Sequence, residues 1–98
     1  MKLSVYPLKD FSSYKLEQNY PNPFNPTTTI NYSIPKDGLV NIRVYDITGR
    51  EIRTLVNEIK VTGNYSIVFN GSNLSNGVYF YKIEAGNFVQ TKRMVLIK

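Results

Sequence analysis

The fold is decided by residues 27–45, which read TTTINYSIPKDGLVNIRVY. Apolar and polar residues alternate on both sides of a turn at Pro35–Gly38, and a period of two is typical of strands with one buried face. The side chains expected to face the core are Ile30, Tyr32, Ile34, Val40, Ile42 and Val44. Gly38 ends the turn, at a position where a positive φ would cost little. The stretch therefore predicts two strands, Thr27–Ile34 and Leu39–Tyr45.

The next segments repeat this pattern. Ile47–Arg50 predicts a turn in which Gly49 takes the left-handed position of a bulged hairpin. We expect a short strand at Glu51–Val56 and a loop at Asn57–Gly63. The residues of a further inward-facing row are Tyr65, Ile67 and Phe69.

The C-terminal third predicts a hairpin. A turn at Asn70–Asn73 leads into a strand that runs to Ala85, and Gly86-Asn87 forms a two-residue loop. The last strand, Phe88–Ile97, runs to the C-terminus. We count six strands, with a seventh before Leu16, and find no segment of helical period. Strands at this spacing predict an all-β fold, a sandwich of two antiparallel sheets with about seven strands.

Size and composition limit the function further. The 98 residues allow one domain. The chain has no cysteine and no histidine, which excludes a disulfide framework and a thiolate zinc site and removes the commonest general base. The net charge is +5, with basic residues spread along the chain, which favours a solvated basic surface and no binding of nucleic acid.

The N-terminal region lacks a clear period. No stretch approaches the roughly 18 apolar residues of a membrane span. The opening Met1–Pro7 is too short for a signal peptide, so we expect any export signal to lie upstream. Leu3, Val5 and Leu8 are compatible with one short strand. We interpret residues 1–15 as a linker or the tail of a preceding domain, and residues 16–98 as the β-sandwich domain.

Catalytic and metal-binding groups do not converge in the sequence. Asp46 with Glu51 is a carboxylate pair across a turn, but an aspartate in this position more often caps the backbone amides of the turn. Asp46 with Asn70 and Asn73 is a weak candidate for a calcium site. We therefore expect no catalytic residues, no metal site and no cofactor.

The strand after Gly77 carries large apolar groups on both faces. Tyr79, Tyr81 and Ile83 point one way, and Val78 and Phe80 point the other. The second face is covered by a neighbour or loop in one interpretation and is an exposed docking patch in the other. Tyr79 also occupies the place of the tyrosine corner of immunoglobulin-like domains, whose hydroxyl bonds back to the preceding corner.

Three segments together resemble a known family, the C-terminal sorting domain of proteins exported by the type IX secretion system (type A, the Por secretion family). The segments are Tyr20–Thr28 (YPNPFNPTT), Val44–Glu51 (VYDITGRE), and Gly77–Tyr81 (GVYFY) followed by Lys92–Leu96 (KRMVL). The family is related to immunoglobulin-like domains of the flagellar hook-cap scaffold. The resemblance implies a seven-stranded immunoglobulin-like sandwich at the end of a larger cargo protein.

The resemblance also implies function and site residues. The domain would direct a covalently preceding cargo protein from the periplasm through the outer-membrane translocon to the cell surface or medium, and a sortase-like peptidase would remove it by cutting within residues 1–19. The residues that match the family's recognition features are Gly77, Val78, Tyr79, Lys92, Arg93, Met94, Val95 and Lys98. The residues that match its entry motif are Pro21, Asn22, Pro23, Asn25 and Pro26. We expect a non-catalytic monomer. The alternatives are a hook-cap-like scaffold domain and a carbohydrate-binding module that stacks sugars on Phe80 and outward tyrosines.

Overall fold

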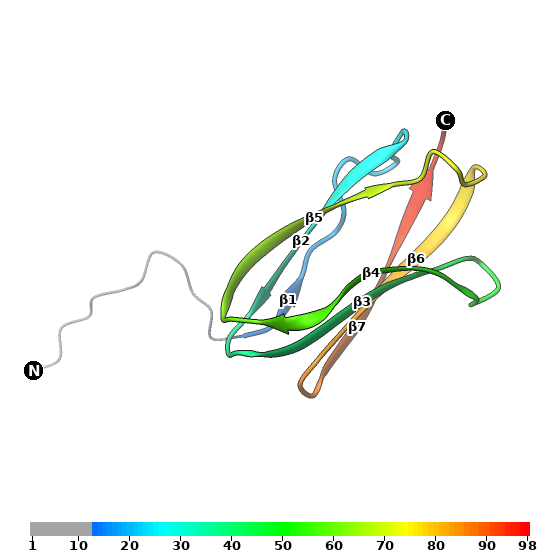
Figure 1. Cartoon of the computed structure of the whole chain (residues 1–98). Helices are drawn as coiled ribbons and strands as arrows, with labels where there is room; N and C mark the ends of the chain where they lie inside the picture. Colours follow the sequence, from blue (N-terminus) through cyan, green and yellow to red (C-terminus); the bar gives the residue numbers. More distant parts are fainter. Residues whose placement is uncertain (1–12) are drawn as a thin grey trace, which may run out of the picture.

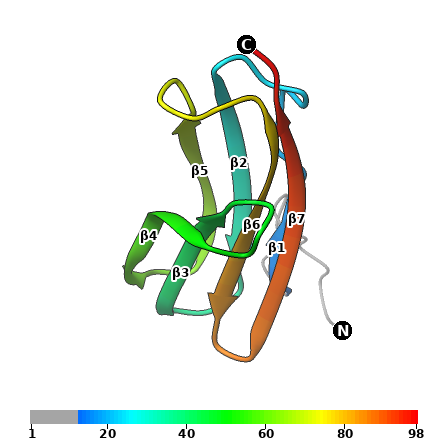
Figure 2. The same ribbon diagram turned by 90° about the vertical axis from the view of Figure 1, so that its right-hand side faces the viewer.

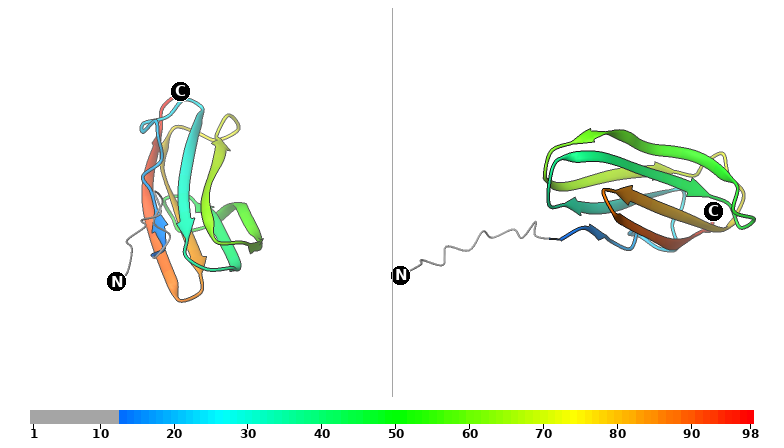
Figure 3. Two further views of the ribbon diagram at one scale, coloured as in Figure 1. Left: turned by 90° about the vertical axis from the view of Figure 1, so that its left-hand side faces the viewer. Right: turned by 90° about the horizontal axis from the view of Figure 1, so that it is seen from below.

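The computed structural model describes residues 13–98, which form seven strands in two antiparallel sheets (Figure 1). The strands are β1 (Lys15–Leu16), β2 (Thr27–Ile34), β3 (Gly38–Tyr45), β4 (Glu51–Lys60), β5 (Gly63–Asn70), β6 (Gly77–Ala85) and β7 (Phe88–Leu96). One sheet has the order β1-β2-β5 and the other has the order β4-β3-β6-β7. The sheets lie face to face as two layers (Figure 3). The predicted antiparallel β-sandwich of about seven strands is confirmed.

The strand order is that of an immunoglobulin-like sandwich. The A, B and E strands of that fold share one sheet and the C, F and G strands share the other. Here β1, β2 and β5 take the first set of places, and β3, β6 and β7 take the second. The fourth strand, β4, lies beside β3 rather than in the first sheet. This order leaves β7, the last strand, at an edge of the four-stranded sheet (Figure 2).

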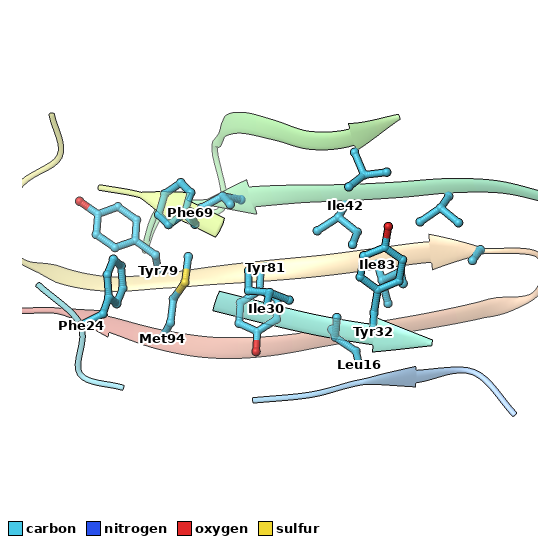
Figure 4. Packing of buried hydrophobic residues seen from close by; sticks show 14 of the residues in the cluster. Leu16, Phe24, Ile30, Tyr32, Ile42, Phe69, Tyr79, Tyr81, Ile83 and Met94 are labelled. Carbon is cyan, nitrogen blue, oxygen red and sulfur yellow. The ribbon is translucent and has the colours of Figure 1, made fainter. Parts of the chain in front are cut away.

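The core lies between the two sheets, where the inward rows of both meet (Figure 4). Every inward residue predicted from the alternation in residues 27–45 is buried. The largest fully buried side chains also include Phe24, Phe69, Tyr81, Met94 and Leu96. These five come from the segment before β2 and from β5, β6 and β7, so the core joins both ends of the domain.

The strand β4 is longer than the sequence predicts. It runs through Lys60, and the expected loop at Asn57–Gly63 shrinks to a turn at residues 61–62. Pairing with β3 from Gly38↔Lys60 onward makes this segment a strand. Its alternation is lost because Glu58 and Ile59 are both exposed on an edge, and because two register shifts insert extra residues into β4.

The predictions of a positive φ at glycines are confirmed at two positions and wrong at one. Gly49 has a φ of 89° and Gly86 a φ of 59°, as the predicted turns require. The expectation of a positive φ at Gly38 is wrong, because Gly38 already lies in β3 and is not among the described positive-φ glycines. The Asp37 carboxylate instead accepts the Thr62 N–H over 2.8 Å and ties this turn to the turn after β4.

The predictions for the two ends of the chain agree with the structure only in part. The seventh strand is present as β1, only two residues long. The last strand ends at Leu96 rather than Ile97. The strand considered at Leu3, Val5 and Leu8 lies outside the described residues. Within the described part of the chain, no helix is long and apolar enough to cross a membrane.

Candidate functional site

The predicted recognition residues of β6 and β7 lie opposite one another in one ladder. Val78 pairs with Val95 and Tyr79 pairs with Met94, while Gly77 pairs with Leu96. Tyr79 and Met94 point into the core, and Val78 and Val95 are half-buried on the outer face. Two motifs that the sequence separates are therefore a single structural element.

The entry segment, residues 18–26, runs beside the end of β7. The Phe24 N–H donates to the Val95 carbonyl over 2.9 Å, and the Ile97 N–H donates to the Phe24 carbonyl over 3.0 Å. The Val95 N–H donates to Asn22 Oδ1 over 3.0 Å, and Gln18 Nε2 donates to the Arg93 carbonyl over 2.7 Å. Figure 2 shows the loop before β2 next to the C-terminus. The proline-rich motif thus pairs with the end of the chain.

The five predicted entry-motif residues contribute in different ways. Asn22 bonds β7 through its side chain. The Pro21 carbonyl accepts the Thr28 hydroxyl over 2.8 Å, and the Pro26 carbonyl accepts the Gly71 N–H over 2.8 Å. Pro23 and Asn25 are exposed. Among these five residues, only Asn22 therefore hydrogen-bonds β7 through its side chain, and Pro21 and Pro26 contribute backbone carbonyls that hold the segment in place.

Phe24 anchors this segment. Its ring is 1% exposed and packs edge-on against Phe69, with ring centroids 6.0 Å apart. Figure 4 shows the ring beside Tyr79 and Met94. Phe24 therefore fixes the segment to the domain, whereas the side chain of Tyr20 is 80% exposed.

The tyrosine corner is confirmed. The Tyr79 hydroxyl donates to the Ser75 carbonyl, four residues upstream, over 2.7 Å. The bond fixes the loop that leads into β6, which includes Asn76. Asn76 Oδ1 in turn accepts the Lys98 N–H over 2.9 Å, and Lys98 Nζ donates to the Ser72 carbonyl over 3.0 Å. The same loop therefore holds the C-terminal residue.

A second tyrosine makes a contact that the sequence did not reveal. The Tyr81 hydroxyl donates to the Glu17 carbonyl over 2.6 Å and accepts the Asn19 N–H over 2.8 Å. Alternation placed Tyr81 on the same face as Tyr79 and Ile83, but its hydrogen-bond partners lie in an N-terminal segment that has no clear period. Burial raises the pKa of Tyr81 to about 12, with the Glu17 charge adding to the rise and the Asn19 N–H opposing it.

Lys92 and Arg93 point to opposite faces of β7, because Lys92 pairs with inward-facing Tyr81 and Arg93 with outward-facing Phe80. Within residues 13–98, neither has a carboxylate within 4.0 Å. The basic residues that do are Arg43, Arg50, Lys60 and Lys82. The unpaired positive charge of the described chain thus includes both basic residues that the sequence singled out on β7.

The outer face of β6 is neither covered nor open. Val78, Phe80 and Lys82 are each half-buried. Phe80 pairs with Tyr45 on one side and with Arg93 on the other, so its flanks are shielded by neighbouring strands. The face is therefore partly covered by neighbouring strands, as the first interpretation expects, and partly exposed, as the docking-patch interpretation expects.

Asp46 caps a turn, as the sequence favours. One of its carboxylate oxygens accepts the N–H and hydroxyl of Thr48 and the N–H of Arg50, over 2.9, 2.6 and 3.0 Å. The Thr48 hydroxyl, followed by the Arg50 N–H, holds the pKa of Asp46 below its ordinary value. An oxygen so occupied is a poor general base or cation ligand.

A shallow hollow of about 340 Å³ lies between the Asp46 turn and the loop before β6. Asn73 lines it together with Asp46, but Asn70 does not. Asn70 Oδ1 accepts the Ser72 N–H over 2.8 Å instead. Among residues 13–98, no group of three or more acidic side chains is placed to hold a metal ion. The weak calcium candidate therefore finds no support in the arrangement of its three residues.

Comparison with known proteins adds one match. A family model described as a secretion system C-terminal sorting domain matches residues 18–98. The matched range contains the entry segment, strands β2 to β7 and every predicted recognition residue. Searches of curated proteins and of solved structures found no match to this chain. The chain belongs to the family of secretion system C-terminal sorting domains, which mark proteins for export by the type IX system to the cell surface or beyond.

Proposed function

We propose that residues 16–98 act as a non-catalytic, monomeric sorting tail whose recognition surface is the end of β7 together with Gly77–Tyr79. The outer-membrane translocon would bind this surface while the covalently preceding cargo is exported. A sortase-like peptidase would then cut within residues 1–19 and release the domain.

The observation that supports this surface is that β7 carries both buried apolar side chains and unpaired basic side chains. Met94 and Leu96 are 0% exposed, so the end of the strand is fixed in the core. Lys92 and Arg93, directly before them, carry charge without a carboxylate partner in the described part of the chain. A rigid strand with unpaired cations is suited to binding a protein of opposite charge.

Export of a reporter tests the proposal. The full chain is fused to the C-terminus of a periplasmic reporter in a host with a type IX system, and surface reporter is measured. Deleting Phe88–Lys98 should leave the reporter in the periplasm. Equal surface display with and without these residues would contradict a sorting role for β7.

Point variants separate recognition from folding. Lys92→Ala with Arg93→Ala should lower export while the melting temperature of the domain changes little. The control, Lys36→Ala with Lys60→Ala, removes the same charge from the turn before β3 and from β4, which lies at the opposite edge of the four-stranded sheet from β7. Equal export of the two double variants would remove Lys92 and Arg93 from the recognition surface.

Removal of the domain is tested by mass spectrometry of the mature cargo. A new C-terminus within residues 1–19 is expected, and an intact C-terminus would favour the hook-cap-like scaffold role instead. No observation favours carbohydrate binding, since Phe80 is half-buried and flanked by Tyr45 and Arg93 rather than part of an open aromatic row.

A further inference from the structure

The backbone groups along the edge of β7 can be assigned from their partners. In an antiparallel pair, the N–H and C=O groups of alternate residues point away from the partner strand. The backbone groups of Val95 and Ile97 bond the entry segment rather than β6. The N–H and C=O groups of the odd-numbered residues of β7 therefore point away from β6, toward the open edge of the sheet. Val89, Thr91 and Arg93 belong to the same set.

This edge is divided into two halves. Near the C-terminus the entry segment bonds the Arg93 carbonyl, both backbone groups of Val95 and the Ile97 N–H. Toward the hairpin, the N–H and C=O groups of Val89 and Thr91 and the N–H of Arg93 have no hydrogen-bond partner within residues 13–98. The strand β1 does not supply one, because it pairs with β2 in the other sheet.

The charge around the open half is positive and unpaired. Lys92 and Arg93 have no carboxylate within 4.0 Å in the described chain, and neither does Lys15 on β1. Tyr14, next to Lys15, stacks on Phe88 at 5.2 Å, which places the start of β1 near the start of β7. Two carboxylates lie nearby: Glu17 follows β1, and Glu84, opposite Val89, is already paired with Arg43 and Lys82. The edge therefore combines unpaired backbone groups with nearby side chains whose net charge is positive.

We propose that the β7 edge at Val89–Arg93 accepts an extended acidic segment of the export machinery by strand addition. This rests on the proposed sorting function and names the chemistry of its partner. Backbone hydrogen bonds supply affinity in strand addition, and side-chain charges supply selectivity. A second copy of this chain fits the edge less well, because it would bring Lys92 and Arg93 against an equally basic strand.

Basic residues on an edge strand also protect it from unwanted pairing. That protective role alone predicts that blocking the edge does not affect export. The two explanations therefore differ in one measurable result.

Thr91→Pro makes this measurement. The Thr91 N–H faces away from β6, so proline removes an edge donor without removing a ladder bond. Thr91→Val, which keeps the N–H, is the matched control. In the full chain fused to a reporter, Thr91→Pro should lower surface export about tenfold relative to Thr91→Val, equivalent to about 1.4 kcal/mol of binding. Equal export, with Thr91→Pro folded, would overturn the proposal.

Charge is tested at two exposed positions, which also covers the case in which Thr91→Pro does not fold. Val89 is 58% exposed and Thr91 is also exposed, so polar substitutions there leave the core intact. Val89→Glu with Thr91→Glu should lower export relative to Val89→Gln with Thr91→Gln. No difference between these pairs would reject an acidic partner.

Hydrogen exchange of the isolated full chain provides a third readout. The amides of Thr91 and Arg93 should exchange much faster than those of Val95 and Ile97. Equal protection would mean that the chain itself or a second copy already occupies the edge, and would overturn the proposal. If deletion of Phe88–Lys98 has no effect on export, the sorting function fails. If that deletion blocks export but the edge variants match their controls, only the edge inference fails.

Discussion

The backbone N–H of Phe24 donates a hydrogen bond to the carbonyl of Val95 over 2.9 Å. This bond joins the proline-rich segment at the start of the domain to the strand at its end. Because Met94 and Leu96 on either side of Val95 are fully buried, the end of the chain completes the core. The sorting tail is thus an integral part of a folded domain rather than a flexible tag.

The contact of Asn22 with the tail gives a first prediction. Asn22→Ala removes the acceptor of the Val95 N–H, and should cost about 0.5–1.5 kcal/mol of unfolding free energy. The Val95 amide should exchange faster with solvent. Asn25→Ala is the control, since Asn25 belongs to the same motif, is exposed, and makes no side-chain hydrogen bond within residues 13–98. Similar exchange of the Val95 amide in both variants would contradict the assignment.

Gly71 allows the close approach of the entry segment and the tail. A Cβ there would lie 3.1 Å from Leu96 Cδ2 and 3.3 Å from Phe24 Cε2. Gly71→Ala should therefore destabilise the domain by about 1–3 kcal/mol in urea unfolding. Gly38→Ala is the matched control, because its Cβ meets nothing within 4 Å. It should be neutral or stabilise by up to about 1 kcal/mol. Equal stabilities would show that the neighbours of Gly71 yield freely.

The tyrosine corner gives a third prediction. Tyr79→Phe removes the hydroxyl that bonds the Ser75 carbonyl and should cost about 1–2 kcal/mol, measured by thermal unfolding. Tyr20→Phe removes a hydroxyl from a side chain that is 80% exposed and should change stability very little. An unchanged melting temperature for Tyr79→Phe would refute the contribution of the corner.

Alkaline pH should destabilise the domain. The pKa values of Tyr32 and Tyr81 are raised from 10.0 to about 12 in the folded chain, mainly by burial. Folded tyrosines therefore keep protons that the unfolded chain releases above pH 10. The stabilisation is complete below pH 10 and is lost as the pH rises through about 12.

Urea unfolding at several pH values checks this result. Between pH 10 and 12 the unfolding free energy should fall less steeply in Tyr81→Phe than in the natural chain, because one of the two tyrosines no longer titrates. Parallel slopes would indicate that Tyr81 ionises equally in the folded and unfolded chains.

Local patterns were enough for most of the fold. Strict alternation in β2 and β3 identified the buried faces, because a strand places successive side chains on opposite sides. Gly49 and Gly86 marked turns that need a positive φ, and the Tyr79 position indicated the corner bond. Alternation failed in β4, where bulges and an exposed edge break the period of two.

The sequence by itself determined where most of the strands lie, which faces of β2 and β3 are buried and, by resemblance, the family. Only the tertiary structure revealed that Asn22 and Phe24 bond the end of β7 and that Tyr81 bonds Glu17 and Asn19. The first kind of information is carried by neighbouring residues, whose periodicity is visible in the chain. The second depends on backbone groups and hydroxyls that have no sequence signature and meet only after both sheets have packed.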